Sequence, residues 1–274
     1  MLSHDWSGPC LHTESTFHQL APYIGKLKSS IAAALIQEYT KPGDVVLDPF
    51  AGAGTIPLEA AMRGRSVCAS DVNPYAMLLT RAKLFPPSDL TEALAAAGKY
   101  LQAAEGCAAR VDLRRVPCWV RRFFHPQTLR EVIAIRDLLV RNREYFLMGC
   151  LLGILHHQRP GFLSYPSSHL VPYLRDGLFP RARYPEMYEY RDVRSRLTAK
   201  IVRAYRRKAL IPFEVDKTCR LTDVRSLRLD EETIDAVITS PPYMNALDYV
   251  RDNRLRLWFL GVSPSRPCSE SPRM

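Results

Sequence analysis

The sequence has no hydrophobic run long enough to cross a bilayer. Its longest uninterrupted apolar stretch, Tyr145 to Leu155, has 11 residues, whereas a membrane-spanning helix needs about 20. The first ten residues, MLSHDWSGPC, also lack the basic cluster and the apolar core of a secretory signal. We therefore predict a cytoplasmic protein that does not bind membranes.

Closely spaced cysteines are missing as well. The 7 cysteines are scattered without a C-x-x-C pair, and their odd number does not suit a disulfide framework or a zinc knuckle. The 7 histidines are spread as widely, and the adjacent His156 and His157 fall on different faces of any helix. The sequence thus predicts no metal site.

The charge is unevenly distributed in an otherwise ordinary globular composition. The 274 residues are 47% hydrophobic and 24% charged, which excludes disorder, collagen and coiled coil. Of the net charge of +10, the segment from Arg110 to Lys208 alone carries +13, with 21 Lys plus Arg and 8 Asp plus Glu. This pattern indicates a polyanion-binding module inside a catalytic scaffold, although a solvated helical surface is the alternative.

Residues 41–87 have the pattern of the start of a doubly wound α/β domain. An apolar strand over 44–47 leads into a glycine-rich turn, a helix is expected from about Thr55 to Arg63, and a second strand over 66–70 leads to Asp71. Asn73 then caps a helix that has Pro74 at its first position and runs to Phe85.

The rest of the chain predicts a helical insertion followed by a return to the sheet. Within the insertion we expect a basic helix over 198–210, an ordered loop over 159–190, and one apolar helical stripe. The stripe consists of Leu129, Val132, Ile133, Leu139 and Val140. Strands are expected over 218–221, followed by Asp223, and over 234–239. A final helix should place Leu247, Val250, Leu257 and Trp258 on one face.

The strand ends are the expected ligand site, because ligands of doubly wound sheets lie outside the carboxyl ends of the strands. Gly52 and Gly54 permit a tight turn and a close backbone approach at a helix N-terminus. Asp48 is placed to accept a hydrogen bond from an ammonium group, Asp71 from a ribose diol, and Asp223 from an adenine amino group. A nucleoside that carries an amino acid would satisfy all three acids.

The motifs resemble those of a known enzyme family. The sequence DPFAGAGT (48–55) followed by TSPPY (239–243) is similar to the amino-methyltransferases that use S-adenosylmethionine, and the serine of SPPY resembles the branch that methylates cytosine N4 in DNA. The segment around Tyr23, Gly25 and Lys26 matches the family's accessory cofactor motif more loosely. The resemblance covers about Tyr23 to Lys83 and Cys219 to Gly261.

The resemblance implies a cofactor, a set of site residues and partners. It implies S-adenosylmethionine as the methyl donor, double-stranded DNA as the substrate, and a cognate restriction endonuclease as a possible partner, with no metal. The catalytic residues would be Ser240, Pro241, Pro242 and Tyr243. The cofactor would be held by Tyr23, Lys26, Asp48, Pro49, Phe50, Gly52, Gly54, Thr55, Asp71, Asn73 and Asp223.

The TSPPY turn also has a direct chemical interpretation. An exocyclic amine is a poor nucleophile because its lone pair is delocalised into the ring. Acceptors for both of its N–H groups localise that pair, and the Ser240 hydroxyl and the Pro241 carbonyl are the candidates. Tyr243 could stack on a base swung out of the helix. An ordinary strand-to-helix turn is the alternative interpretation.

The insertion is the candidate target-recognition region. The segment from Trp119 to His125 mixes arginines with aromatics, and Arg203, Arg206 and Arg207 lie at helical spacing. Phe123 and Phe124 fit a role in the hydrophobic core better than base stacking.

We predict an α/β fold, a doubly wound Rossmann-like methyltransferase sheet with a large, mainly helical insertion. Residues 1–87 form the N-terminal half of the methyltransferase domain, 88–212 the basic insertion, and 213–274 the continuation with a short irregular tail. Only thirteen residues follow Gly261, so the family's further C-terminal strands are expected to be missing and the SPPY strand to form a sheet edge. Two alternatives stay open, an RNA (tRNA) amino-methyltransferase and a truncated, inactive DNA-binding remnant.

Overall fold

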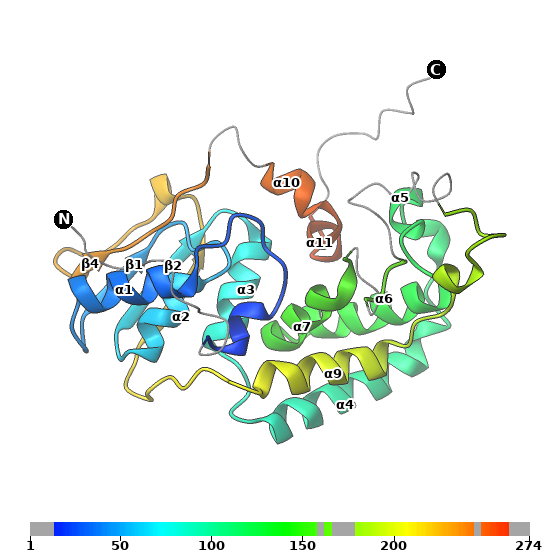
Figure 1. Ribbon diagram of the computed structural model, residues 1–274, viewed down its shortest axis with the longest axis horizontal. Coiled ribbons are helices and arrows are strands. Elements are labelled where there is room, and N and C mark those ends of the chain that lie inside the picture. Colours follow the sequence, from blue (N-terminus) through cyan, green and yellow to red (C-terminus); the bar gives the residue numbers. More distant parts are fainter. Residues whose placement is uncertain (1–13, 158–161, 166–178, 244–247, 263–274) are drawn as a thin grey trace, which may run out of the picture.

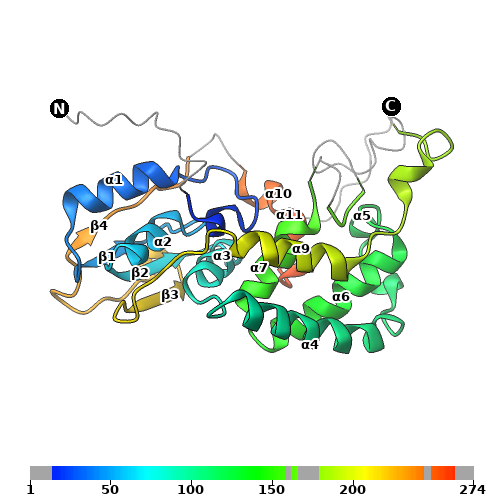
Figure 2. The same cartoon turned by 60° about the horizontal axis from the view of Figure 1, so that its bottom comes forward.

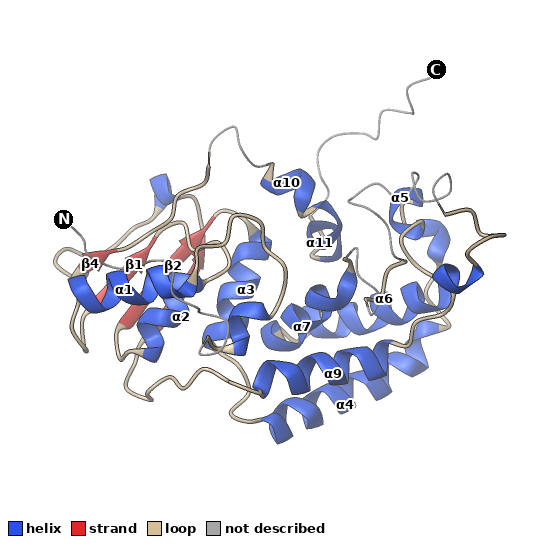
Figure 3. Ribbon diagram, viewed as in Figure 1, coloured by secondary structure: helices blue, strands red, loops and turns tan. Residues whose placement is uncertain are grey.

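An α/β half and a helical half lie side by side in the molecule (Figure 1). The computed structural model describes residues 14–157, 162–165, 179–243 and 248–262. All of its strands gather in the α/β half, and the other half is built from helices and loops (Figure 3). The predicted α/β fold class, with a parallel Rossmann-like sheet and a large helical insertion, is confirmed.

The helices and strands have the following bounds. The first part of the chain contains η2 (Thr16–Gln19), α1 (Ser29–Tyr39), β1 (Val45–Asp48), α2 (Thr55–Met62), β2 (Ser66–Asp71) and α3 (Pro74–Leu84). The insertion contains α4 (Leu90–Ala108), η3 (Leu113–Arg115), α5 (Cys118–Arg121), α6 (Pro126–Arg141), α7 (Tyr145–Leu155), η4 (Pro185–Tyr188) and α9 (Val193–Tyr205). The last part contains β3 (Lys217–Leu221), η5 (Val224–Ser226), β4 (Ala236–Val237), α10 (Tyr249–Asp252) and α11 (Arg254–Phe259).

The order of the strands places a ligand crevice next to β1. The four parallel strands lie in the order β3-β2-β1-β4, so the chain proceeds from β1 outward to β3 and then returns to the opposite side of β1. Such a reversal is a topological switch point, and ligands bind there at the carboxyl ends of the strands. Right-handed crossovers place α2 and α3 on one face of the sheet, and α1 packs against α2 (Figure 2).

Two local signals fix the loops at this end of the sheet. The Asn73 side chain accepts a hydrogen bond from the Tyr75 N–H and so caps α3, whose first residue is Pro74, as predicted. Gly54 is the N-cap residue of α2 and has φ +70°, in the left-handed region. A Cβ on Gly54 would lie 2.9 Å from Thr80 Cα on α3. Gly54 therefore permits both the turn and the close packing of the loop on α3.

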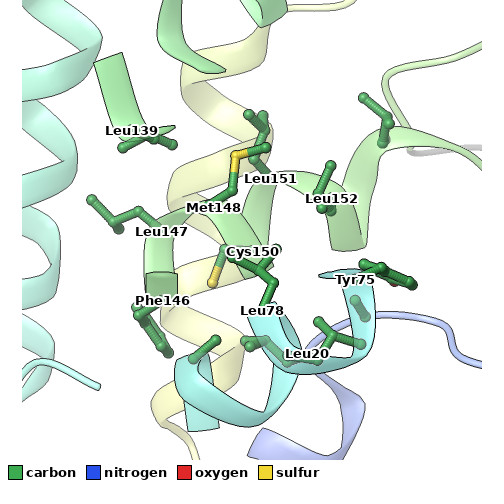
Figure 4. Packing of buried hydrophobic residues seen from close by; sticks show 14 of the residues in the cluster. Leu20, Tyr75, Leu78, Leu139, Phe146, Leu147, Met148, Cys150, Leu151 and Leu152 are labelled. Carbon is green, nitrogen blue, oxygen red and sulfur yellow. The ribbon is translucent and has the colours of Figure 1, made fainter. Parts of the chain in front are cut away.

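A single hydrophobic core joins the insertion to the sheet. Helix α7 is apolar on all sides, and its residues from Phe146 to Leu155 are buried, as expected for a helix at the centre of a domain. It packs against α3, α6 and α9, and Leu78 and Leu20 contact it from the α/β half (Figure 4). No helix among the described residues, α7 included, is long and apolar enough to cross a membrane. Because the core is continuous, the domain boundaries at residues 88 and 212 stay a prediction.

The strand predicted over 234–239 is shorter than expected. Only Ala236 and Val237 form β4, and within the described part of the sheet β4 pairs with β1 alone. At its start the Asp235 carboxylate accepts the Val45 N–H at 2.7 Å, while the Asp235 N–H donates to the Val45 carbonyl at 3.1 Å. A side chain thus supplies one of the hydrogen bonds between the two chains at this position.

The predicted helices differ from the observed ones in three places. The single helix expected after SPPY is two, α10 and α11, which meet at Asn253. The Asn253 Nδ2 donates to the Tyr249 carbonyl at 2.9 Å. The backbone of Asn253 has φ −103° and ψ 8°, which are not helical values. Val250 is exposed and Leu257 is buried, while Leu247 lies outside the described residues.

The remaining differences lie in the insertion. The basic helix α9 begins five residues earlier than expected because the Asp192 carboxylate caps it by accepting the Ser195 N–H. In the predicted apolar stripe of α6, Leu129, Val132, Ile133 and Leu139 are buried, whereas Val140 is 47% exposed. The expected loop over 159–190 is only partly described and includes the short helix η4.

We expect Gly54→Ala to lower the free energy of unfolding by about 2–4 kcal/mol, from left-handed backbone strain and overpacking. The close approach of Thr80 leaves no room for a methyl group. Gly98→Ala in α4 is the matched control, because no atom lies within 4 Å of its added Cβ, and there stability should be unchanged or rise by up to about 1 kcal/mol. Urea denaturation followed by circular dichroism measures both, and equal effects would refute the packing role of Gly54.

Candidate active site

The loops after β1, β2 and β4 surround one cavity at the switch point. Its volume is about 510 Å³, within the range of about 300–1,000 Å³ that small-molecule sites occupy. Its walls include Ser240 and Pro242 of the SPPY turn together with Asp48, Phe50 and Gly52 of the glycine-rich turn. Further residues of the wall are Tyr23, Lys26, Thr55, Asp71, Asn73, Tyr249, Val250 and Leu257. The two motifs therefore face the same cavity although they lie far apart in the sequence.

A direct hydrogen bond ties the two motifs together. Thr239 Oγ1 donates to Asp48 Oδ1 at 2.6 Å, and the Phe50 N–H donates to the same oxygen at 3.2 Å. Asp48 is 2% exposed, and its burial raises the pKa of the carboxyl group to about 7, although both hydrogen bonds act in the opposite direction. The carboxyl group at the centre of the site is thus close to half-ionised at neutral pH.

Asp71 holds the glycine loop against the end of β2. One of its oxygens accepts the Gly52 N–H at 2.9 Å and the other accepts the Asn73 N–H at 2.8 Å. Gly52 has φ +51°, and this left-handed conformation directs the loop past the carboxylate. Burial raises the pKa of Asp71, while the backbone donors lower it. An ionised carboxylate has further lone pairs with which to accept hydrogen bonds from a ligand.

Aromatic side chains form one wall of the cavity. The Tyr23 ring lies 5.8 Å from the Tyr75 ring and 6.2 Å from the Tyr249 ring, measured between centroids. Tyr75 is buried, and its hydroxyl donates to the Pro22 carbonyl at 2.7 Å. The loop that carries Tyr23 is thus anchored on α3. Burial raises the pKa of Tyr23, so its hydroxyl stays neutral.

A buried lysine supports the glycine loop from behind. Lys83 on α3 is 1% exposed, and its Nζ donates a hydrogen bond to the Ala53 carbonyl. Burial lowers the pKa of Lys83 to about 7. This role is not predicted from the sequence, although a lysine inside the apolar run of a helix was the available signal.

One polar atom of the cavity wall has no partner. Thr55 begins α2 at the cavity wall, and its buried Oγ1 forms no hydrogen bond with the described residues. Buried hydroxyls are normally satisfied, and a helix N-terminus favours anionic groups. A ligand carboxylate would accept a hydrogen bond from the Thr55 hydroxyl and place a negative charge at the N-terminus of α2. Together with Asp48 and Asp71, these features fit a zwitterionic amino acid joined to a nucleoside.

Most of the predicted site residues lie together, but five do not line the cavity. Pro49, Gly54, Pro241, Tyr243 and Asp223 are absent from its described wall. Gly54 packs against Thr80, as described above, and Tyr243 is 54% exposed. Asp223, for which an adenine contact was expected, forms an ion pair with Arg225 at 2.6 Å, and its proposed contact stays a prediction.

The aromatic part of the insertion is structural. Phe123 and Phe124 are 1% and 2% exposed and belong to the core, in agreement with the preferred interpretation. The guanidinium of Arg254 lies 4.2 Å from the centre of the Trp119 ring, so this tryptophan packs on the chain itself. Arg203 on α9 and Arg206, the residue that follows this helix, are exposed.

Tyr249 was missed from the sequence. It lies in α10, after the SPPY turn, and reaches the cavity through its contact with Tyr23. An aromatic residue just beyond the motif was the only available signal. Val250 and Leu257 of the same wall were expected on one helix face but were not assigned to the site. No group of three His, Cys, Asp or Glu side chains in the described ranges is arranged to hold a metal ion.

The sequence that carries these loops is similar to known methyltransferase sequences. Residues 19–104 match the UPF0020 family model, an RMKL-like methyltransferase domain. The chain is 24% identical to the Type II methyltransferase M.BsoBI of Geobacillus stearothermophilus over 276 aligned residues, which cover 92% of this chain and 54% of that protein. It is 28% identical to the Type II methyltransferase M.MjaII of Methanocaldococcus jannaschii over 67 residues, 24% of this chain and 13% of that protein. The chain thus spans about half the length of the first relative. No solved structure matches.

The raised pKa of Asp48 predicts a dependence of stability on pH. Unfolded aspartate titrates near pH 4, whereas folded Asp48 titrates at about 7. Between these values the folded chain holds a proton that the unfolded chain releases, so this group's contribution to stability falls as the pH rises. This fall in the free energy of unfolding amounts to on the order of a few kcal/mol between about pH 4 and 7. We expect Asp48→Asn to abolish it.

Urea denaturation at a series of pH values measures this difference. Asp230→Asn, at an exposed position, is the matched control and should keep the wild-type pH profile. An Asp48→Asn profile parallel to that of the wild type would contradict the assignment.

Proposed function

We propose that the chain transfers a methyl group from S-adenosylmethionine to the exocyclic N4 amine of cytosine in DNA. The observation that carries the proposal is the single cavity shared by the DPFAGAGT and SPPY turns, whose Asp48 and Thr239 are 191 residues apart and hydrogen-bonded. The match to an RMKL-like methyltransferase domain and the similarity to Type II methyltransferases support it.

The cavity wall contains a partner for each part of this cofactor. Asp48 would accept from the ammonium group, and Thr55 at the start of α2 would donate to the carboxylate. Asp71 would accept from the ribose diol, and Phe50 and Val72 would contact the adenine ring. When bound, the cofactor supplies an electrophilic methyl group on a sulfonium. Tyr23 and Lys26 close the cavity on the side of the N-terminal loop.

The SPPY turn would activate the target amine. Ser240 lies on the cavity wall, and its hydroxyl together with the Pro241 carbonyl would accept the two N–H groups. This would localise the nitrogen lone pair for attack on the methyl group, the S–C bond would break as the N–C bond forms, and the amine would release a proton to solvent. Exposed Tyr243 is available to stack on an extruded base. Positioning supplies much of the rate, without a covalent enzyme intermediate.

The basic insertion supports a nucleic acid as the substrate. Its local charge of +13 between Arg110 and Lys208 favours contacts with phosphates. The two relatives are Type II methyltransferases, so we propose that this chain acts site-specifically on duplex DNA and belongs with a cognate restriction endonuclease.

The decisive experiment incubates the purified protein with tritiated S-adenosylmethionine and either duplex DNA or total tRNA, and identifies the modified base. Label in N4-methylcytosine of DNA is the expected result. Label only in tRNA would replace the proposal with an RNA amino-methyltransferase. Cofactor binding without transfer to either nucleic acid would favour an inactive DNA-binding protein.

We expect Ser240→Ala to lower kcat by about 10- to 100-fold, the equivalent of one lost hydrogen bond to a polar transition state. Cofactor affinity should stay nearly unchanged, because the proposed contact is with the target amine. Ser226→Ala, at an exposed position in η5 away from the cavity, is the matched control with unchanged kcat. Single-turnover methylation and calorimetric cofactor titration measure the two quantities. An equal loss of cofactor binding would show that the role of Ser240 is different.

A further inference from the structure

A second cavity lies behind the Tyr23 loop. It has a volume of about 750 Å³ and opens between the residues after η2, the end of α7, helix α9 and the junction of α10 with α11. Helices α7 and α9 pack against each other beside that loop (Figure 1). Tyr23 and Lys26 line this cavity as well as the first one. The two cavities therefore share one wall.

The described wall of the second cavity is strongly cationic. Lys26, Lys200, Arg203 and Arg256 line it, and Asp252 is its one described carboxylate. Asp252 already faces Arg251, whose Nε lies 3.4 Å from its Oδ1. Four cations thus face a cavity that offers them little negative charge.

The two buried cations are held by neutral groups. Lys200 is 5% exposed, and its Nζ donates to the Gln19 carbonyl at 2.8 Å. Arg256 is also 5% exposed, and its guanidinium donates to the carbonyls of His156 at 3.0 Å and Leu152 at 3.3 Å. Carbonyl oxygens satisfy the N–H groups, but no carboxylate among the described residues pairs with either charge.

Buried charges are normally paired or bound to an ion of opposite sign, because desolvation is costly otherwise. Burial lowers the pKa of Lys200 to about 8, which is the response of a cation without a carboxylate partner. An anion bound in the cavity would compensate the positive charge of these two side chains. Arg203 differs from these two residues in being exposed, so an anion can reach it from solvent.

We propose that this cavity binds a phosphate of the nucleic-acid backbone next to the nucleotide whose base enters the first cavity. The arrangement suits a phosphodiester because arginine guanidinium groups match phosphate oxygens in pairs, and because Tyr23 and Lys26 separate the site from the reacting end of the substrate by a single wall. The chemical class of the ligand rests on the charges of this cavity, and its assignment to DNA rests on the function proposed above.

The test compares two exposed arginines at the C-terminal end of α9. Arg203 lines the cavity, whereas Arg206, three residues further along, does not. We expect Arg203→Ala to weaken the binding of a duplex oligonucleotide by about 3- to 10-fold and to reduce the slope of log affinity against log salt by about 1. Arg206→Ala should have a clearly smaller effect on both. Fluorescence anisotropy over a salt series gives these values, and cofactor affinity should not change in either variant.

Lys200→Met supplies a second measurement inside the cavity. It removes the charge and keeps most of the side-chain volume, so it should reduce the salt slope in the same way while circular dichroism reports an intact fold. Inorganic phosphate is the competitor. At constant ionic strength it should displace the duplex from the wild-type protein and displace it less effectively from Arg203→Ala.

The outcomes separate the two proposals. An equal loss for Arg203→Ala and Arg206→Ala would mean that α9 attracts DNA through its overall charge, and it would overturn the phosphate site. Phosphate binding that depends on Arg203, with duplex affinity unaffected, would identify a free phosphate compound as the ligand and overturn the assignment to the DNA backbone. Arg203-dependent duplex binding without methyl transfer would support the site while the proposed function fails.

Discussion

The junction between β1 and β4 is the contact on which the candidate site depends. Val46 pairs with Ala236 and Leu47 with Val237. Just beyond these pairs, the hydroxyl of Thr239, two residues after Val237, reaches the carboxyl group of Asp48, the residue after Leu47. Because β4 is so short, this side-chain bond extends the pairing where the ladder ends. It fixes the SPPY turn relative to the glycine-rich turn, and without that register the two loops would not enclose a common cavity.

The sequence predicted the parts of the fold that local signals determine. The strand and helix pattern of residues 44–85, the cap at Asn73 and the meeting of the strand ends depend on short-range chemistry and on a general property of parallel sheets. The parts that failed depend on side chains acting over long distances or against the local pattern. The Asp235 carboxylate bonds the Val45 N–H where the expected strand begins late, and the Asn253 side chain bonds the Tyr249 carbonyl where the expected helix is interrupted. No motif or periodicity reveals such partners.

The insertion is part of the structural unit that holds the site. Gly153 of α7 lies so close to the Leu20 carbonyl that an added Cβ would be 2.1 Å from its oxygen. Leu20 precedes the loop that carries Tyr23, and Lys200 of α9 donates to the neighbouring Gln19 carbonyl. The helical half thus positions one wall of the first cavity. A larger side chain at Gly153 would therefore reach the candidate cofactor site through packing alone.

The hydroxyl of Thr239 has a property that a charged partner would not have. A hydroxyl group can donate one hydrogen bond and also accept others, so it donates to Asp48 when the acid is ionised and can accept a hydrogen bond from the carboxyl O–H when the acid is neutral. The link between the two strand ends is therefore preserved through the titration of Asp48, which is centred at about pH 7. Proton uptake changes the electrostatic potential inside the pocket while the architecture around it persists.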